Sequence, residues 1–140
     1  MISDTWASLV DGDLYVDWPI GPVAGLIDKS GIYNTEPLLH FIQNWFKKYN
    51  NETQRKFVVA SGEVNSGSYI LWNETATDIP KAIVSSAAIP MLFPSQNWGN
   101  NIVAMDGGAV YGTNIVSAIN RCREIVGDKG DRITLDIIVT

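Results

Sequence analysis

Apolar and polar positions follow two different periods along the chain, and the changes of period mark its elements. Between residues 34 and 49 apolar residues recur every three or four positions behind a Glu-Pro first turn, which predicts an amphipathic helix. Asn34 or Thr35 is placed to cap this helix. Two β-rich runs follow, at 56–60 and 68–72, and the Gly, Asn and Ser residues between them suit a hairpin-like connection.

The second half of the chain continues the alternation of helix and strand. Residues 77–89 predict a short helix of small residues that packs closely against a sheet, with Pro in its first turn and Pro after its end. A strand at 102–105, a helix at about 113–125 and a buried strand at 132–140 complete the pattern. Residues 1–29 have no regular period, so no firm element is assigned to them. The chain is therefore predicted to have an α/β fold with a sheet layer.

Composition sets the domain count and excludes some partners. The 140 residues are 46% hydrophobic, which is enough for one core, and we expect a single domain over residues 1–140. A net charge of −5 with scattered Lys and Arg argues against nucleic-acid binding through overall charge, and Lys47-Lys48 is interpreted as a solvated helix end. No apolar run approaches the ~20 residues of a transmembrane segment.

The strongest candidate for chemistry is the tripeptide Asp106-Gly107-Gly108, which follows the strand predicted at 102–105. Ligands and reacting groups gather at the carboxyl ends of strands in open α/β sheets, so Asp106 is a candidate acid or base. The two glycines remove side chains that would shield the carboxylate and permit backbone angles closed to other residues. The alternative is a tight turn capped by Asp106, and the tripeptide alone favours that turn.

Other short motifs surround this tripeptide in a fixed order. They are a Gly-aromatic turn leading into a Pro-Leu-Leu helix, the turn Val64-Asn65-Ser66-Gly67, the helix end Ser86-Ala87-Ala88-Ile89-Pro90, the step Phe93-Pro94, and Asp106-Gly107-Gly108 itself. Their order resembles the C-terminal half of the patatin-like phospholipase family. The resemblance runs from about residue 31 to about residue 123, and several ordered motifs are far more specific than any one of them.

The resemblance carries expectations about fold and activity. It implies part of a three-layer α/β/α domain with a central sheet, and a lipid acyl hydrolase that cleaves phospholipid or acylglycerol esters with a Ser-Asp dyad. In that dyad Asp106 is the general base, and Gly107 and Gly108 support it. We expect a lipid or membrane-surface ester as substrate, and no cofactor, metal or nucleic acid. The compartment stays open, with the cytoplasm or the periphery of a membrane favoured.

The nucleophile of the dyad is missing from these residues. A nucleophile elbow needs Gly-x-Ser-x-Gly, and neither Ser61 nor Ser66 has a glycine two positions before it. The glycine-rich oxyanion loop is missing as well. We therefore expect the chain to be the C-terminal part of a patatin-like domain, inactive alone and poorly soluble or self-associating. Two alternatives remain: a non-catalytic relic that binds lipid or a protein, and an unrelated α/β module in which Asp106 only shapes a turn.

Two further sets of residues have a plain structural explanation. His40, the one histidine, lies one helical turn after Glu36, so a surface pair accounts for it better than catalysis does. The aromatic residues Trp72, Phe93 and Trp98 could touch lipid, because indoles favour the boundary between water and lipid. Core or ordinary surface positions explain these three side chains better.

Overall fold

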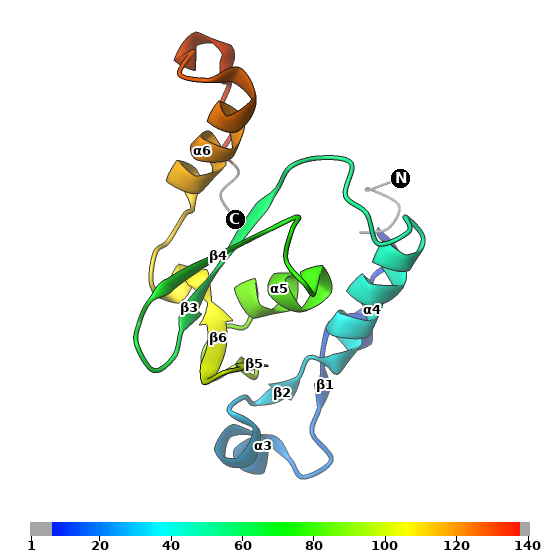
Figure 1. Cartoon of the computed structure of the whole chain (residues 1–140). Coiled ribbons are helices and arrows are strands. Elements are labelled where there is room, and N and C mark those ends of the chain that lie inside the picture. Colours follow the sequence, from blue (N-terminus) through cyan, green and yellow to red (C-terminus); the bar gives the residue numbers. More distant parts are fainter. Residues whose placement is uncertain (1–6, 138–140) are drawn as a thin grey trace.

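A four-stranded antiparallel sheet lies at the centre of the computed structural model, which describes residues 7–137 (Figure 1). Its order is β4-β3-β6-β5. The bounds of these strands are Val58–Glu63 for β3, Tyr69–Asn73 for β4, Gln96–Gly99 for β5 and Ile102–Asp106 for β6. The helices and the central sheet confirm the α/β class predicted from the sequence.

The predicted hairpin forms between β3 and β4. Five residue pairs join the two strands, from Val58 opposite Asn73 to Gly62 opposite Tyr69. On its other side β3 pairs with β6, and this register sets Ser61 opposite Asp106. The edge strand β5 was not predicted, because its sequence Gln-Asn-Trp-Gly has no β-branched residue.

The two central helices begin where the sequence predicted. Helix α4 spans Glu36–Lys47, with Thr35 at its N-cap and the Glu36 N–H donating to Asn34 Oδ1 at 2.8 Å. Helix α5 spans Ile79–Ser86, and the Asp78 carboxylate accepts a hydrogen bond from the Lys81 N–H at 3.0 Å. That bond satisfies one of the free N–H groups at the helix start. Helix α5 ends three residues before the expected position.

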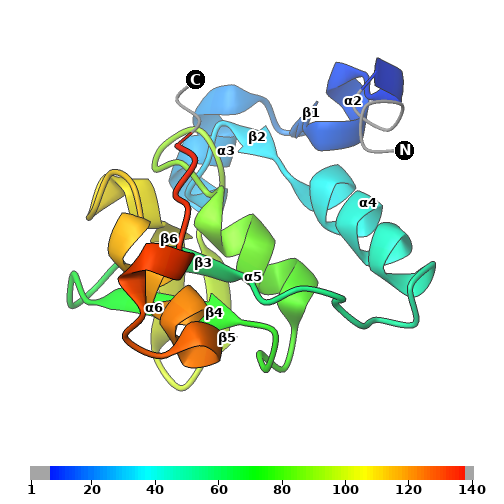
Figure 2. The same cartoon turned by 90° about the horizontal axis from the view of Figure 1, so that it is seen from above.

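Helix α5 lies between the sheet and α4 (Figures 1 and 2). The larger side chains Ile42, Phe46 and Val84 form the core between the two helices. On the sheet side the contact is made by small residues, and Ala82 of α5 and Ala104 of β6 are fully buried. The small-residue helix therefore packs directly on the sheet, as the sequence predicted.

The N-terminal part of the described chain contains short elements that the sequence pattern did not predict. They are α2 at Asp11–Leu14, α3 at Pro22–Lys29, and the paired strands β1 at Val16–Asp17 and β2 at Tyr33–Asn34. Helix α3 starts with Pro at its first position, which favours a helix start. Helix α2 and the two strands are too short to produce a detectable period, and α3, as long as α5, contains Gly25, which weakens a helical signal.

The C-terminal part differs from the prediction in one respect. The turn η1 at Gly107–Ala109 leads into α6 at Ile115–Val126, which agrees with the helix expected there, and η2 follows at Gly130–Arg132. Residues 133–137, however, pair with no described strand and are mostly exposed. The prediction of a buried strand is wrong over these residues, since no strand of residues 7–137 pairs with them, and residues 138–140 lie outside the described part.

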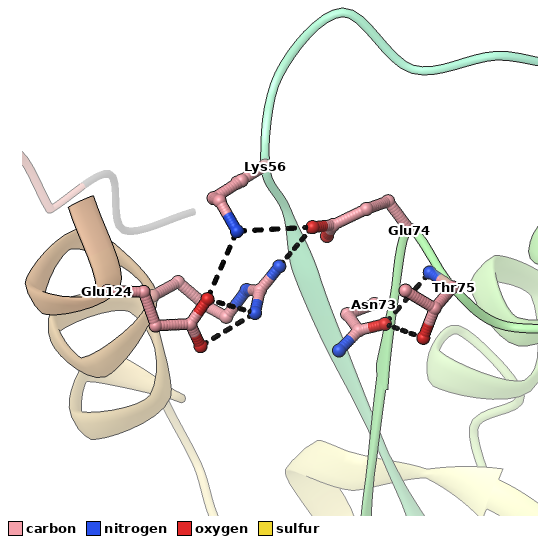
Figure 3. A network of polar contacts seen from close by, with 6 residues as sticks. Lys56, Asn73, Glu74, Thr75 and Glu124 are labelled. Carbon is pink, nitrogen blue, oxygen red and sulfur yellow. Dashed lines mark hydrogen bonds and ion pairs between the residues drawn. The ribbon is translucent and has the colours of Figure 1, made fainter.

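An ionic cluster attaches α6 to the β3–β4 hairpin (Figure 3). Arg121 of α6 pairs with Glu74, next to the end of β4, and with Glu124 of its own helix. Lys56, just before β3, pairs with Glu124 at 3.1 Å and with Glu74 at 3.6 Å. The hydrogen bonds from Lys56 and then Arg121 lower the pKa of Glu124. Side chains from three segments thus hold α6 beside the sheet.

Candidate active site

Asp106 is the last residue of β6, and the backbone and its own turn fix its position. Its N–H donates to the carbonyl of Ala88, in the loop after α5, at 2.9 Å. Its Oδ1 accepts a hydrogen bond from the Gly108 N–H at 2.7 Å. Within residues 7–137 no group donates to Oδ2. One carboxylate oxygen is therefore held by the turn, and the other is open to a further partner.

The two glycines after Asp106 are needed for space rather than for unusual backbone angles. The positive φ values among the described glycines occur at other positions, so this part of the sequence interpretation was wrong. A Cβ on Gly107 would lie 2.5 Å from the Ala60 carbonyl oxygen of β3. A Cβ on Gly108 would lie 3.1 Å from Oδ1 of Asp106. Gly107 thus lets the turn contact the sheet, and Gly108 leaves room for the carboxylate.

A cleft of about 220 Å³ opens beside Asp106. Its walls come from β3, the start of β4, the end of α5, the η1 turn and the residue before α6. The polar side chains among the lining residues are Tyr69, Ser86, Asp106 and Asn114. The sequence pattern singled out Asp106 of these four, because Tyr69 and Asn114 belong to no recognised motif and Ser86 entered only as part of a helix end.

Two of these side chains have unusual polar environments. Burial, and then the negative charge of Asp106, raise the pKa of the Tyr69 phenol, which therefore stays protonated and able to donate a hydrogen bond. The Asn114 Nδ2 group is buried, and it finds no hydrogen-bond partner within residues 7–137. A buried donor without a partner is costly, and a ligand acceptor in the cleft would satisfy it.

The two serines considered from the sequence do not line this cleft. Ser61 is fully buried, and its Oγ accepts a hydrogen bond from Trp72 Nε1 at 3.1 Å. Ser66 lies in the exposed turn between β3 and β4, where its N–H donates to the Glu63 carboxylate. His40 is exposed on α4, outside the cleft lining. Ser61 is opposite Asp106 in the β3–β6 register, but its Oγ is bonded to Trp72, and none of the three residues hydrogen-bonds to Asp106 within residues 7–137.

The tryptophans suggested as lipid contacts are packed against each other. The rings of Trp72 and Trp98 stack with centroids 4.1 Å apart and an interplanar angle of 15°. Trp98 Nε1 donates to Ser85 Oγ of α5 at 3.0 Å. Phe93 lies near the rings of Tyr15 and Tyr33, within 6.0 and 6.5 Å. All three residues are at most half-exposed, which favours the interior role over contact with lipid.

The loop after α5 is fixed on both of its sides. At one end Ala88 holds Asp106, as described above. At the other, the N–H groups of Ile32 and Tyr33 donate to the carbonyls of Met91 and Leu92, each at 3.0 Å. Gly31 permits this contact, because a Cβ there would lie 2.5 Å from the Pro94 nitrogen. The motifs that are separate in the sequence therefore meet around one loop.

A comparison with known families agrees with this arrangement. Residues 1–119 match the family model for the patatin-like phospholipase. The chain belongs to the patatin-like phospholipase family. The match begins before residue 31, where the motif-based resemblance starts, so it also includes the short N-terminal elements. No curated protein and no solved structure matched the chain.

Membership of the patatin-like family bears on two of the sequence-based expectations. It excludes the interpretation as an unrelated α/β module, and it gives the chain a family that acts on lipids. No helix among the described residues has the length and apolar character needed to cross a bilayer.

Proposed function

We propose that this chain carries the general base of a patatin-like Ser-Asp dyad that hydrolyses phospholipid or acylglycerol esters, and that Asp106 is that base. The nucleophilic serine and the oxyanion donors would come from sequence beyond these 140 residues. The observation that carries the proposal is the state of the Asp106 carboxylate. Oδ1 is fixed by the Gly108 N–H, whereas Oδ2 has no donor among the described residues.

To act as a general base, Asp106 needs a fixed side chain and one carboxylate oxygen that is open to the nucleophile. As a serine oxygen attacks the acyl carbon, its proton passes to the carboxylate, the alcohol of the ester leaves with a proton, and an acyl-enzyme forms. Water then releases the fatty acid by the same proton transfers. Because the turn holds Asp106 through Oδ1, the open oxygen is already oriented when the nucleophile arrives.

No serine among the described residues hydrogen-bonds to Asp106. Ser86 lines the same cleft, but it is the last residue of α5 rather than part of a strained turn between strand and helix. We therefore expect no ester hydrolysis above background from the 140-residue chain. Measurable turnover that disappears in Asp106→Ala and in Ser86→Ala would contradict this expectation and identify Ser86 as the nucleophile.

The first test is to read the transcript through the region before Met1, and the proposal is then tested in the longer protein that it encodes. An in-frame glycine-rich loop with Gly-x-Ser-x-Gly is the expected result, and that longer protein is then assayed on a short-chain ester. Asp106→Asn should lower kcat by about 100-fold or more, the contribution typical of a general base. Asp128→Asn, an exposed aspartate after α6, is the matched control and should keep full activity.

The second candidate is a non-catalytic relic that binds lipid or a protein. The absence of Gly-x-Ser-x-Gly from these residues favours it. A transcript that starts cleanly at Met1 would support the relic and overturn the catalytic proposal, as would a longer protein whose activity survives Asp106→Asn.

A further inference from the structure

A wide groove lies at the C-terminal end of α4, outside the lining of the Asp106 cleft. It has a volume of about 990 Å³ and runs between the last turns of α4 and the segment that leads to β3. Figures 1 and 2 place this end of α4 on the far side of α5 from β6. Its charged lining side chains are Lys48, Arg55 and one acidic residue, Glu52, and its aromatic lining side chains are Phe41, Trp45, Phe46, Tyr49 and Phe57.

Aromatic side chains form the apolar part of the groove. Trp45 lies in the last turn of α4 and Tyr49 just after its end, with ring centroids 5.4 Å from each other, and they are 39% and 40% exposed. Phe46 beside them also lines the groove, but it is largely buried and belongs to the core. Indole and phenol rings prefer the boundary between water and lipid, because each has an apolar body and a polar tip.

The charge around the groove is opposite to that of the rest of the chain. Residues 45–57 hold four of the ten Lys and Arg residues and one of the fifteen Asp and Glu residues. The remainder holds six basic and fourteen acidic residues. Lys56 is occupied by the ionic cluster described above, whereas Lys48 and Arg55 line the groove and form no ion pair within residues 7–137.

We propose that this aromatic and cationic surface, formed by Trp45, Lys48, Tyr49 and Arg55, docks the protein on an anionic phospholipid bilayer. Cations next to a membrane surface are attracted by acidic head groups, while neighbouring aromatic rings insert at the level of those head groups. The acidic remainder of the chain is repelled, which turns this face toward the lipid. The proposal rests on the lipid substrate proposed above, but docking itself requires no hydrolysis.

The test is flotation with phosphatidylcholine vesicles, with or without phosphatidylserine. Flotation is chosen over sedimentation because aggregated protein sinks, whereas vesicle-bound protein rises. The parent chain should float with the vesicles that contain phosphatidylserine, and added salt should release it. Lys48→Glu/Arg55→Glu should weaken this binding about 30-fold or more, because two cations near the surface contribute about 1 kcal/mol each.

Matched variants separate the groove from net charge and from the catalytic proposal. Arg123→Glu/Lys129→Glu makes the same change of charge at exposed positions in and after α6, and binding should be retained. Asp106→Asn should bind vesicles as well as the parent does. The docking proposal and the catalytic proposal are therefore tested independently of each other. Vesicle binding should shift the tryptophan fluorescence emission of the parent chain to shorter wavelength. Trp45→Phe should remove the contribution of Trp45 to that shift.

Three results would overturn the proposal. The first is flotation that does not depend on phosphatidylserine. The second is equal loss of binding in the groove variant and in the α6 control. The third is a dimer that Trp45→Ala/Tyr49→Ala dissociates, because a second copy of the chain would then occupy the groove.

Discussion

Asp106 shows how a single residue can serve a turn and remain available for chemistry. From the tripeptide alone, the capping turn and the catalytic carboxylate are competing explanations. In the structure both hold for different atoms, since Oδ1 caps the turn and Oδ2 accepts nothing from the described residues. The cap fixes the side chain, so it supports the proposed role of Asp106 as a base.

Gly107→Ala tests the close contact between the turn and the sheet. The new methyl group would lie 2.5 Å from the Ala60 carbonyl oxygen, so the turn or β3 has to move. Overpacking of this kind costs about 1–3 kcal/mol, and we expect the free energy of unfolding to fall by that amount in urea titration. Gly130→Ala is the control, because a Cβ there meets no atom within 4 Å and should leave stability nearly unchanged. Equal stability of the two variants would show that the turn does not contact the sheet this closely.

The sequence could predict Asp106 and its two glycines, but not the rest of the cleft. Asp106 belongs to a motif that is contiguous in the chain. Tyr69 and Asn114 come to the cleft from β4 and from the start of α6, and a local pattern contains no information on which distant segments meet. The sequence also could not show why Gly107 has to be a glycine, because the reason depends on the position of Ala60 in a neighbouring strand.

Among the elements, the β3–β4 turn is held to β6 by one buried carboxylate. Glu63 accepts hydrogen bonds from Asn65 Nδ2 at 3.1 Å, the Ser66 N–H at 2.6 Å and the Val103 N–H at 3.4 Å. Hydrogen bonding from Ser66, from its side chain first and then from its backbone, lowers the pKa of Glu63 to about 2. The turn therefore depends on the ionised form of this side chain.

Protonation of Glu63 should weaken the fold in acid. Its folded pKa of about 2 lies below the ordinary value of 4.5, so its contribution is full above the ordinary value and is lost as the pH falls toward 2. Glu63→Gln should lower the urea midpoint at neutral pH and flatten the pH dependence of stability within this window. The exposed Glu52→Gln is the control and should keep the parent's slope. An unchanged slope in Glu63→Gln would contradict the assignment.

Elements with a strong local signal were the ones predicted correctly. Helix α4 has a clear period and a capping residue, and β4 is rich in β-branched and aromatic residues. Strand β3 begins with Val58-Val59 as predicted, but it continues through Ser61, Gly62 and Glu63, which the sequence assigned to the connection. The failures at β5 and at residues 133–137 have a common cause, because a strand exists only where a neighbour pairs with it. Gln96–Gly99 pairs with β6 despite weak propensity, whereas residues 133–137, which alternate apolar and polar side chains, pair with no described strand.

The molecule as a whole leaves many apolar side chains exposed. Among them, Leu135 and Ile137 are 43% and 52% exposed in a segment that pairs with no described strand, while β4 and β5 are open sheet edges. Unpaired edges and exposed apolar segments favour association between chains. The expectation of poor solubility is thus consistent with this surface.

Self-association should depend on the apolar residues after η2. We expect the mass from light scattering to rise with concentration for the parent chain, and to rise less for Leu135→Lys/Ile137→Lys. Val23→Lys/Ile27→Lys on α3 is the matched control, since those side chains are 72% and 76% exposed but lie in a helix rather than an unpaired segment. A parent chain that stays monomeric at every concentration would contradict this prediction.

The stacked tryptophans Trp72 and Trp98 should also give a spectroscopic signal that depends on the folded sheet. Trp72 and Trp98 face each other at 4.1 Å, and their N–H groups end on Ser61 of β3 and Ser85 of α5. Electronic transitions of two indoles this close are coupled, so the pair should add an exciton signal to the circular dichroism spectrum. That signal requires β4 and β5 to be in place together, because each strand supplies one ring. Loss of this exciton signal on heating would show the temperature at which β4 and β5 separate. It would do so independently of helix unfolding and without an added label.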